Sequence, residues 1–167
     1  MALSDRSPEG DTVGRHISAN ATFGMKMHIG VDSQTGLTHS AVITAANVHD
    51  KHPLPDLLHG REQRVWGDSA YASQKELIHS KAPAATDCTN RRVRPGSPME
   101  ELERLVNRAK SRVRARVEHV FAVVKRLWGF DKVRYRGLSK NATRSFVTLG
   151  LANIYLARGA LYGQVRP

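Results

Sequence analysis

The chain has 167 residues, of which 40% are hydrophobic and 25% charged. These values are typical of one globular domain with a real core and exclude a disordered chain. Its single cysteine, Cys88, excludes an internal disulfide, so we expect a reducing, cytoplasmic location. Because no signal-peptide core or bilayer-spanning apolar run is present, we expect neither secretion nor membrane insertion.

The net charge of +11 is unevenly distributed. Residues 1–100 carry 11 basic and 11 acidic side chains, whereas residues 101–167 carry 15 basic and 4 acidic ones. A cationic region of this size attracts polyanions, because neutralising phosphates releases counterions. We therefore expect a nucleic acid as partner. An anionic membrane surface and a merely soluble basic helix face are the weaker alternatives.

The first part of the chain is predicted to be an irregular tail followed by a sheet. Residues 1–22 are rich in Ser, Asp, Gly and Arg and show little periodicity, as expected of a tail. Apolar and polar residues then alternate over 25–31, residues 32–36 have turn composition, and residues 37–46 are rich in β-branched side chains. This pattern predicts two strands joined as an antiparallel hairpin.

Short elements are predicted in the middle of the chain. Residues 47–58 favour a short helix that crosses over the sheet, residues 64–67 a brief apolar strand, and residues 73–79 another helix. Residues 81–98 contain three prolines and a cluster of arginines without apolar periodicity. We expect this last segment to be a basic loop.

A long helix is predicted over residues 98–128. Ser97 as the N-cap, Pro98 at the first helical position and Glu100 two residues later match a capping box. Apolar residues at helical spacing then predict one buried stripe that ends near Gly129. The stripe consists of Leu102, Leu105, Val106, Ala109, Val113, Val117, Val120, Phe121, Val124 and Trp128.

The chain is predicted to end in a second long helix. Residues 131–140 are basic and form a connection, and residues 141–161 have the apolar content of a core helix. Residues 162–167 are predicted to be a short tail. We therefore expect one domain over residues 23–161.

Asp68 is a candidate catalytic and metal-binding residue. It follows the strand predicted over 64–67, and the functional groups of α/β sheets gather at the carboxyl ends of strands. The alternative is a turn-capping aspartate, because Asp readily accepts hydrogen bonds from nearby backbone amides. The position alone leaves both interpretations open.

Glu118 is the second candidate acid, and it lies among cations. Arg114, Glu118 and Lys125 lie at i, i+4 and i+11, which brings them to one side of the predicted helix. The alternative is a solvated ion-pair strip worth about 0.3 kcal/mol per pair. Because a lone carboxylate weakens a phosphate-binding strip, we favour Glu118 as the ligand of a divalent cation held beside a polyanion.

These residues resemble those of the DDE transposases of bacterial insertion sequences. Arg114, Glu118 and Lys125 match the arginine-glutamate-lysine signature around that family's third acid, with Ser111 where the family has a tyrosine. The resemblance covers about residues 23–158, in which five segments resemble the family's blocks in the family's order. They are residues 23–32 (FGMKMHIGVD), 44–50 (TAANVHD), 67–71 (GDSAY), 114–119 (RARVEH) and 132–138 (KVRYRGL).

The resemblance implies an α/β fold of the RNase H-like type, a mixed sheet flanked by helices. It also implies three acids that bind two Mg²⁺ (or Mn²⁺) ions, with Asp68 as the second acid and Glu118 as the third. The implied activity is metal-dependent strand cleavage and transfer at transposon ends, with double-stranded DNA as substrate and a homodimer as the active form. Beside Arg114 and Lys125, other basic residues are then candidate contacts to the DNA backbone. These are Arg91, Arg92, Arg94, Lys132, Arg134 and Arg136.

The family's first acid has no clear counterpart in this sequence. In the family it is an Asp within an apolar strand, immediately before the segment that begins here at Phe23. Only Asp5 and Asp11 lie upstream, and neither lies within an apolar segment. We therefore expect a sheet that lacks its first, central strand, in a chain truncated at its N-terminus.

Two other functions are compatible with parts of the sequence. A catalytically inactive transposase remnant would bind DNA through the basic C-terminal half without cutting it. A basic RNA-binding protein would explain the charge but not the five ordered segments. Metal-dependent cleavage that is lost on Asp68→Ala or Glu118→Ala would distinguish the enzyme from both alternatives.

Overall fold

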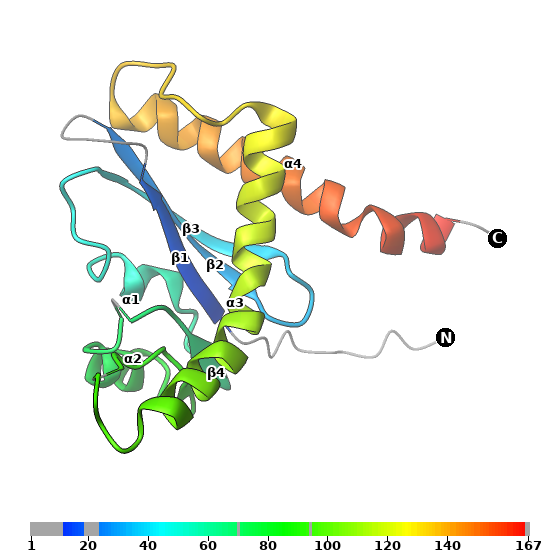
Figure 1. Ribbon diagram of the computed structural model, residues 1–167. Coiled ribbons are helices and arrows are strands. Elements are labelled where there is room, and N and C mark those ends of the chain that lie inside the picture. The colour runs from blue at the N-terminus through cyan, green and yellow to red at the C-terminus, as the bar shows by residue number, and fades with distance from the viewer. Residues whose placement is uncertain (1–11, 19–23, 70, 94, 166–167) are drawn as a thin grey trace.

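Within the described residues, a five-stranded mixed sheet forms the centre of the molecule, and the long helix α3 (Glu100–Trp128) crosses one of its faces (Figure 1). The computed structural model describes residues 12–18, 24–69, 71–93 and 95–165. Strands β1, β2 and β3 are antiparallel neighbours, whereas β4 runs parallel to β1, and β5 parallel to β4. In the spatial order of the sheet, the strands are β3 (Thr38–Ala45), β2 (Met25–Asp32), β1 (Thr12–Ser18), β4 (Arg64–Trp66) and β5 (Thr86–Asp87).

Strand β1 corrects two expectations, that the sheet lacks its central strand and that residues 1–22 form a tail. β1 pairs with residues 26–32 of β2 on one side and with Val65 and Trp66 on the other. Without β1, backbone groups of both neighbours would lack partners, and this requirement outweighs the weak strand pattern of the segment. The rest of the expected tail, with Asp5 and Asp11, lies outside the described residues.

The predicted hairpin of β2 and β3 is confirmed, and Asp32 forms its turn. The carbonyl oxygen of Asp32 accepts a hydrogen bond from the Gly36 amide at 2.9 Å. Its carboxylate accepts hydrogen bonds from the amides of Gln34 and Thr35 at 3.0 and 2.9 Å. Gly36 has a φ of 73°, a left-handed conformation that glycine adopts without steric cost.

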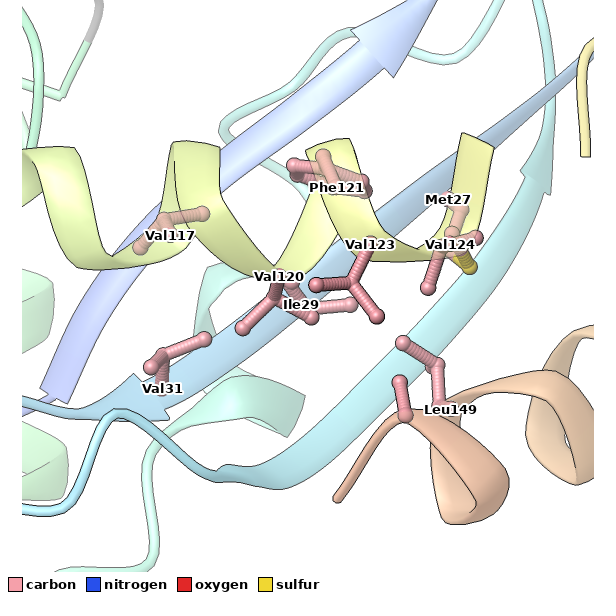
Figure 2. Close-up of a cluster of buried hydrophobic side chains, with 10 residues drawn as sticks. Met27, Ile29, Val31, Val117, Val120, Phe121, Val123, Val124 and Leu149 are labelled. Atoms are coloured by element: carbon pink, nitrogen blue, oxygen red, sulfur yellow. The ribbon is translucent and has the colours of Figure 1, made fainter. Parts of the chain in front are cut away.

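The main core lies between β2 and α3. Alternate side chains of β2 face the second half of α3, as the period of two in a strand requires (Figure 2). Each large apolar side chain buried here contributes roughly 1.5–3 kcal/mol to folding. The cluster consists of Met27, Ile29 and Val31 of β2, Val117, Val120, Phe121, Val123 and Val124 of α3, and Leu149 and Ala152 of helix α4 (Leu138–Val165).

A smaller core lies on the opposite face of β4. Trp66 packs against the main core, so its neighbour Val65 points to the other side of the strand. There Val65 packs with Leu54, Tyr71 and Ile78, all of them buried. The two short helices predicted from the sequence supply part of this core, the second of them shifted by two residues. They are α1 (Leu54–Leu57) and α2 (Lys75–Lys81).

Helix α3 (Glu100–Trp128) confirms the predicted long helix but not its predicted start. Its N-cap is Met99, which makes no side-chain cap, so the capping box at Ser97 is wrong. The Glu100 carboxylate instead accepts a hydrogen bond from the Gly96 amide at 2.7 Å. The acid thus reaches back to a free amide as expected, but one residue further upstream.

The apolar stripe of α3 is buried only in its second half. Leu102, Leu105 and Val106 are 52%, 56% and 44% exposed, against the prediction of a continuous buried stripe. The reason is that the first turns of α3 extend past β4, where the sheet no longer covers them (Figure 1). Gly129, with a left-handed φ of 55°, ends the helix where predicted.

Helix α4 (Leu138–Val165) begins earlier and ends later than the helix predicted over residues 141–161. It contacts β3 and α3, and its second half extends away from the sheet (Figure 1). The segment 81–98, predicted to be a loop throughout, contains β5, which pairs with β4 and extends the sheet by one strand. Within the described ranges, no helix has the length and apolar content needed to cross a bilayer.

Candidate functional site

Asp68 lies directly beyond the carboxyl end of β4, where Gly67 allows close packing of the chain. A Cβ atom added to Gly67 would lie 3.1 Å from Cδ2 of Tyr71 and 3.2 Å from Cγ2 of Thr89. The Tyr71 amide donates to the carbonyl oxygen of Asp68 at 3.1 Å and closes a turn. The half-buried Asp68 thus occupies a position where α/β sheets present functional groups.

Tyr71 lies close to two carboxylates, Asp68 and Asp50. Its side chain is buried, and its hydroxyl has no hydrogen-bond partner in the part of the chain that the structure describes. Burial raises the pKa of Tyr71, and the negative charges of Asp68 and Asp50 raise it further. A carboxylate from the loop after β3 and one from the loop after β4 therefore both act electrostatically on the same buried hydroxyl.

Asp50 is held in place by Lys26 at the start of β2. The Nζ atom of Lys26 lies 3.0 Å from Oδ1 of Asp50 and donates to the carbonyl oxygen of Val48, also at 3.0 Å. The two side chains are only 15% and 16% exposed, so water screens this pair less than it screens a surface pair. The pair fixes the loop after β3 beside the beginning of β2.

Glu118 lies on a flank of α3 with half of its side chain accessible. Its Oε1 atom lies 4.0 Å from Nη2 of Arg114, so the predicted i, i+4 neighbours do meet. Ser111, at the tyrosine position of the signature, accepts a hydrogen bond from Nδ2 of Asn90 at 3.3 Å. This bond attaches the preceding loop to α3 on the turn before Arg114.

The described carboxylates do not form the three-acid set that two metal ions need. Strand β1 has the sequence TVGRHIS and contains no Asp or Glu. Because Val13 pairs with Trp66 in parallel, the part of β1 level with Asp68 is the stretch around Arg15 and His16. Among the described residues, no three His, Cys, Asp or Glu are arranged to hold a metal ion. The metal-binding side chains among the described residues therefore do not fit a two-metal centre.

Two predicted DNA contacts, Lys125 and Lys132, meet Lys26 around a small cavity. The cavity has a volume of about 100 Å³ and lies between β2, the end of α3 and the segment that follows it. Apolar side chains such as Phe121 line much of it, and Asp131 is an acidic residue of the lining. Lys26 is about 100 positions from Lys125 and Lys132, so the fold brings these lysines to one cavity, although the Lys26 ammonium is already paired with Asp50.

Two basic loops lie at opposite ends of α3 (Figure 1). Near its start, the Asn107 side chain accepts from the Arg91 amide at 3.1 Å and donates to its carbonyl oxygen at 2.8 Å. Beyond its end, the Asn141 side chain donates to the carbonyl oxygens of Tyr135 and Gly137 at 2.6 and 2.7 Å. Both loops are thus held by their backbones while their charged side chains stay accessible. The exposed basic residues are Arg91, Arg92, Lys132, Arg134 and Arg136, and Arg94 lies outside the described residues.

The fold and the site together define a mixed α/β protein with acids beside a cationic surface. A family model described as Transposase DDE domain matches residues 9–154, most of the chain, so the protein belongs to this family. The match begins upstream of β1, earlier than the resemblance from residue 23, and implies a role in transposition with DNA as partner. Transposases of this family typically use a divalent metal ion. Comparison with solved structures gives no match.

Sequence reasoning missed the roles of Lys26 and Tyr71. Both lie within segments that resemble the family's blocks, and Tyr71 follows Asp68 by only three residues. The sequence positions of these two residues do not indicate a functional site. Lys26, for example, is a polar position in a strand of alternating polar and apolar residues. The Lys26–Asp50 hydrogen bond and the electrostatic effect of Asp50 on Tyr71 join residues more than 20 positions apart, which local patterns do not reveal.

Proposed function

We propose that this chain is a transposase domain that binds double-stranded DNA along the exposed side of α3. The observation that carries this proposal is the placement of the two basic loops at opposite ends of that helix. Asn107, which holds the first loop, and Trp128, the last residue of α3 before the second loop, are about 30 Å apart at a rise of 1.5 Å per residue. This span is close to one turn of duplex DNA, about 34–36 Å, so both loops can contact one face of the same duplex.

Salt dependence of duplex binding tests this proposal. The triple substitution Lys132→Gln, Arg134→Gln and Arg136→Gln removes three exposed charges from the second basic loop. The slope of log K against log salt is expected to fall in magnitude by about 2.7, from about 0.9 per phosphate contact.

A matched control removes three exposed charges from the electroneutral half of the chain, with Lys51→Gln, Arg61→Gln and Lys75→Gln. Fluorescence anisotropy of a labelled duplex measures both variants. The control should keep the parent slope, and equal losses in the two variants would refute a localised DNA surface. Preferential binding of RNA at equal salt would instead favour the RNA-binding alternative.

We propose DNA binding rather than cleavage as the activity of this chain. Metal-dependent cleavage and strand transfer at the ends of an insertion sequence would require a third carboxylate beside Asp68 and Glu118, and β1 does not contain one. Incubation of the chain with transposon-end duplex and Mg²⁺ or Mn²⁺ is therefore expected to yield no strand breaks. Metal-dependent nicking that disappears in Asp68→Ala and in Glu118→Ala would contradict this and establish the enzyme.

An RNase H-like assignment is part of the same proposal. The order β3-β2-β1-β4-β5, with an antiparallel trio followed by two parallel strands, supports it. A second copy of the chain is the proposed protein partner, because a transposon has two ends and a pair of chains is the smallest assembly that holds both. Light scattering with and without end duplex tests this, and a mass of one chain per complex would exclude the pair.

A further inference from the structure

A second cationic site lies on the side of α3 away from Glu118. It is an open notch of about 290 Å³ between β4, the turn after β2 and the middle of α3. Among the described residues that line it, three are arginines and none is acidic. The arginine notch, as we name it, is lined by Ser33, Arg64, Trp66, Arg112, Val113 and Arg116.

The helical geometry of α3 separates this notch from the signature residues. Arg112 and Arg116 are four positions apart and share one flank of the helix. Arg114 follows Arg112 by two positions, which at about 100° per residue places it about 200° around the helix. The buried stripe that includes Val117 lies between the two flanks. A ligand in the arginine notch is therefore distinct from one held by Arg114 and Glu118.

Two contacts hold groups of the notch in place. Nη1 of Arg116 donates to the carbonyl oxygen of Gln34 at 3.0 Å, which fixes its guanidinium beside the hairpin turn. Cζ of Arg64 lies 5.9 Å from the ring centroid of Trp66, within cation–π range. Trp66 is half-buried, with one side packed on the main core. The notch thus combines guanidinium groups suited to phosphates with an aromatic ring supported from behind.

We propose that the arginine notch binds a single-stranded segment of DNA, with phosphates on Arg112 and Arg116 and an unpaired base stacked near Trp66 and Arg64. The inference rests on the proposed function, because it adds a second DNA contact to a DNA-binding domain. Single strands suit this chemistry since an unpaired base can reach a stacking ring, whereas the bases of a duplex remain stacked on one another.

Tryptophan fluorescence tests the proposal, because Trp66 and Trp128 are the two tryptophans of the chain. An oligothymidylate should quench the Trp66 emission of the full chain carrying Trp128→Phe, and the quench should disappear in the parent carrying Trp66→Phe. A duplex of equal length should quench much less. Circular dichroism verifies that each variant is folded, and the unsubstituted chain provides the same measurement should either substitution impair folding.

Charge substitutions provide the second arm of the test. Arg64→Gln with Arg112→Gln should weaken oligothymidylate binding about tenfold or more, because it removes the cation beside the stacked base and one phosphate contact. The salt slope should fall in magnitude by about 0.7, because Arg112 is the one phosphate contact that this variant removes and a single strand loses about 0.7 per contact. The matched control Arg126→Gln removes an exposed charge of the same helix outside the notch and should keep the Trp66 quench.

Absence of Trp66 quenching in the folded parent would overturn the proposal, as would an equal quench by duplex or equal losses in Arg64→Gln/Arg112→Gln and Arg126→Gln. The triple Lys132, Arg134 and Arg136 variant separates the two sites. If that variant binds duplex like the parent, the proposed function fails while the quench still reports on the notch. If duplex binding falls and no quench occurs, the notch alone is refuted.

Discussion

The side chain of Asn153 pairs with the backbone of Thr38 through two hydrogen bonds, accepting from its amide at 2.9 Å and donating to its carbonyl oxygen at 2.7 Å. Thr38 is the first residue of β3, the strand at one edge of the sheet. The pair joins residues 115 positions apart and holds α4 against that edge. α4 thus covers backbone groups that an edge strand otherwise leaves open to other chains.

We predict that Asn153→Ala lowers the free energy of unfolding by about 1–3 kcal/mol, because it leaves a part-buried amide and carbonyl of Thr38 without partners. Urea denaturation followed by circular dichroism measures the change. Thr143→Ala, an exposed substitution on the same helix, is the control and should shift the midpoint little. Equal midpoints for Asn153→Ala and the parent would show that the pair does not secure α4.

The Lys26–Asp50 pair is expected to behave as a shielded ion pair. Lys26→Met should destabilise the protein by about 2–4 kcal/mol, since the Asp50 carboxylate would stay largely buried without its cation. Asp50→Asn in the same chain should restore part of the loss, because no uncompensated charge remains. The double-mutant cycle in urea gives the coupling energy directly. Strict additivity of the two substitutions would contradict the assignment.

Removal of the Tyr71 hydroxyl should not harm the fold. Tyr71→Phe is expected to leave the free energy of unfolding unchanged or raise it by about 1 kcal/mol, because burying a hydroxyl without a partner is costly. Tyr71→Ala should lower it by about 3–5 kcal/mol through the cavity that it leaves. Thermal and urea unfolding compare both variants. A large loss in Tyr71→Phe would mean that the hydroxyl has a partner in the folded protein.

The turn residue Asp32 should make the free energy of unfolding depend on pH in the acidic range. Partial burial acts to raise the pKa of Asp32, but hydrogen bonds from the Thr35 side chain and from the amides of Gln34 and Thr35 outweigh it, so the pKa is lowered. Because the pKa of Asp32 is lower in the folded protein, its ionised carboxylate contributes fully to stability at a pH above the pKa of the unfolded chain, about 3.9. This contribution is lost as the pH falls through the pKa of the folded state.

Asp32→Asn should therefore be less stable than the parent at pH 7, and the difference should shrink below about pH 3.9. Urea midpoints at pH 7, 5 and 3.5 test this. Asp56→Asn, an exposed carboxylate of α1, is the control and should shift the midpoints little. A gap between Asp32→Asn and the parent that persists unchanged at pH 3.5 would assign the effect to the shape of the side chain and not to its charge.

The local sequence pattern was enough to predict the elements with strong periodicity. The alternation in β2 and the helical stripe through Val117, Val120 and Val124 predicted the two surfaces that meet in the main core. The stripe did not predict how far the sheet reaches along the helix, so Leu102, Leu105 and Val106 are exposed against expectation. Exposure along a helix depends on the length of the neighbouring strands, and β4 has only three residues.

Elements that depend on long-range pairing could not be predicted from the local sequence pattern. Residues 12–18 have weak strand character, and their conformation depends on β2 and on β4, the latter about 50 positions away. The candidate acids Asp68 and Glu118 were recognisable because each lies in a family-like segment. The grouping of Tyr71 with Asp68 and Asp50, and the collection of Arg64, Arg112 and Arg116 in one notch, arise only when distant elements pack.

The central place of β1 has a consequence for any shortened form of this protein. A chain that began at residue 19 would keep both candidate acids, both basic loops and the arginine notch. It would also expose unpaired backbone along β2 and β4, two rows that readily recruit strands from other molecules and lead to precipitation. The seven residues of β1 include none of the candidate site residues, yet we expect their removal to turn the protein toward aggregation.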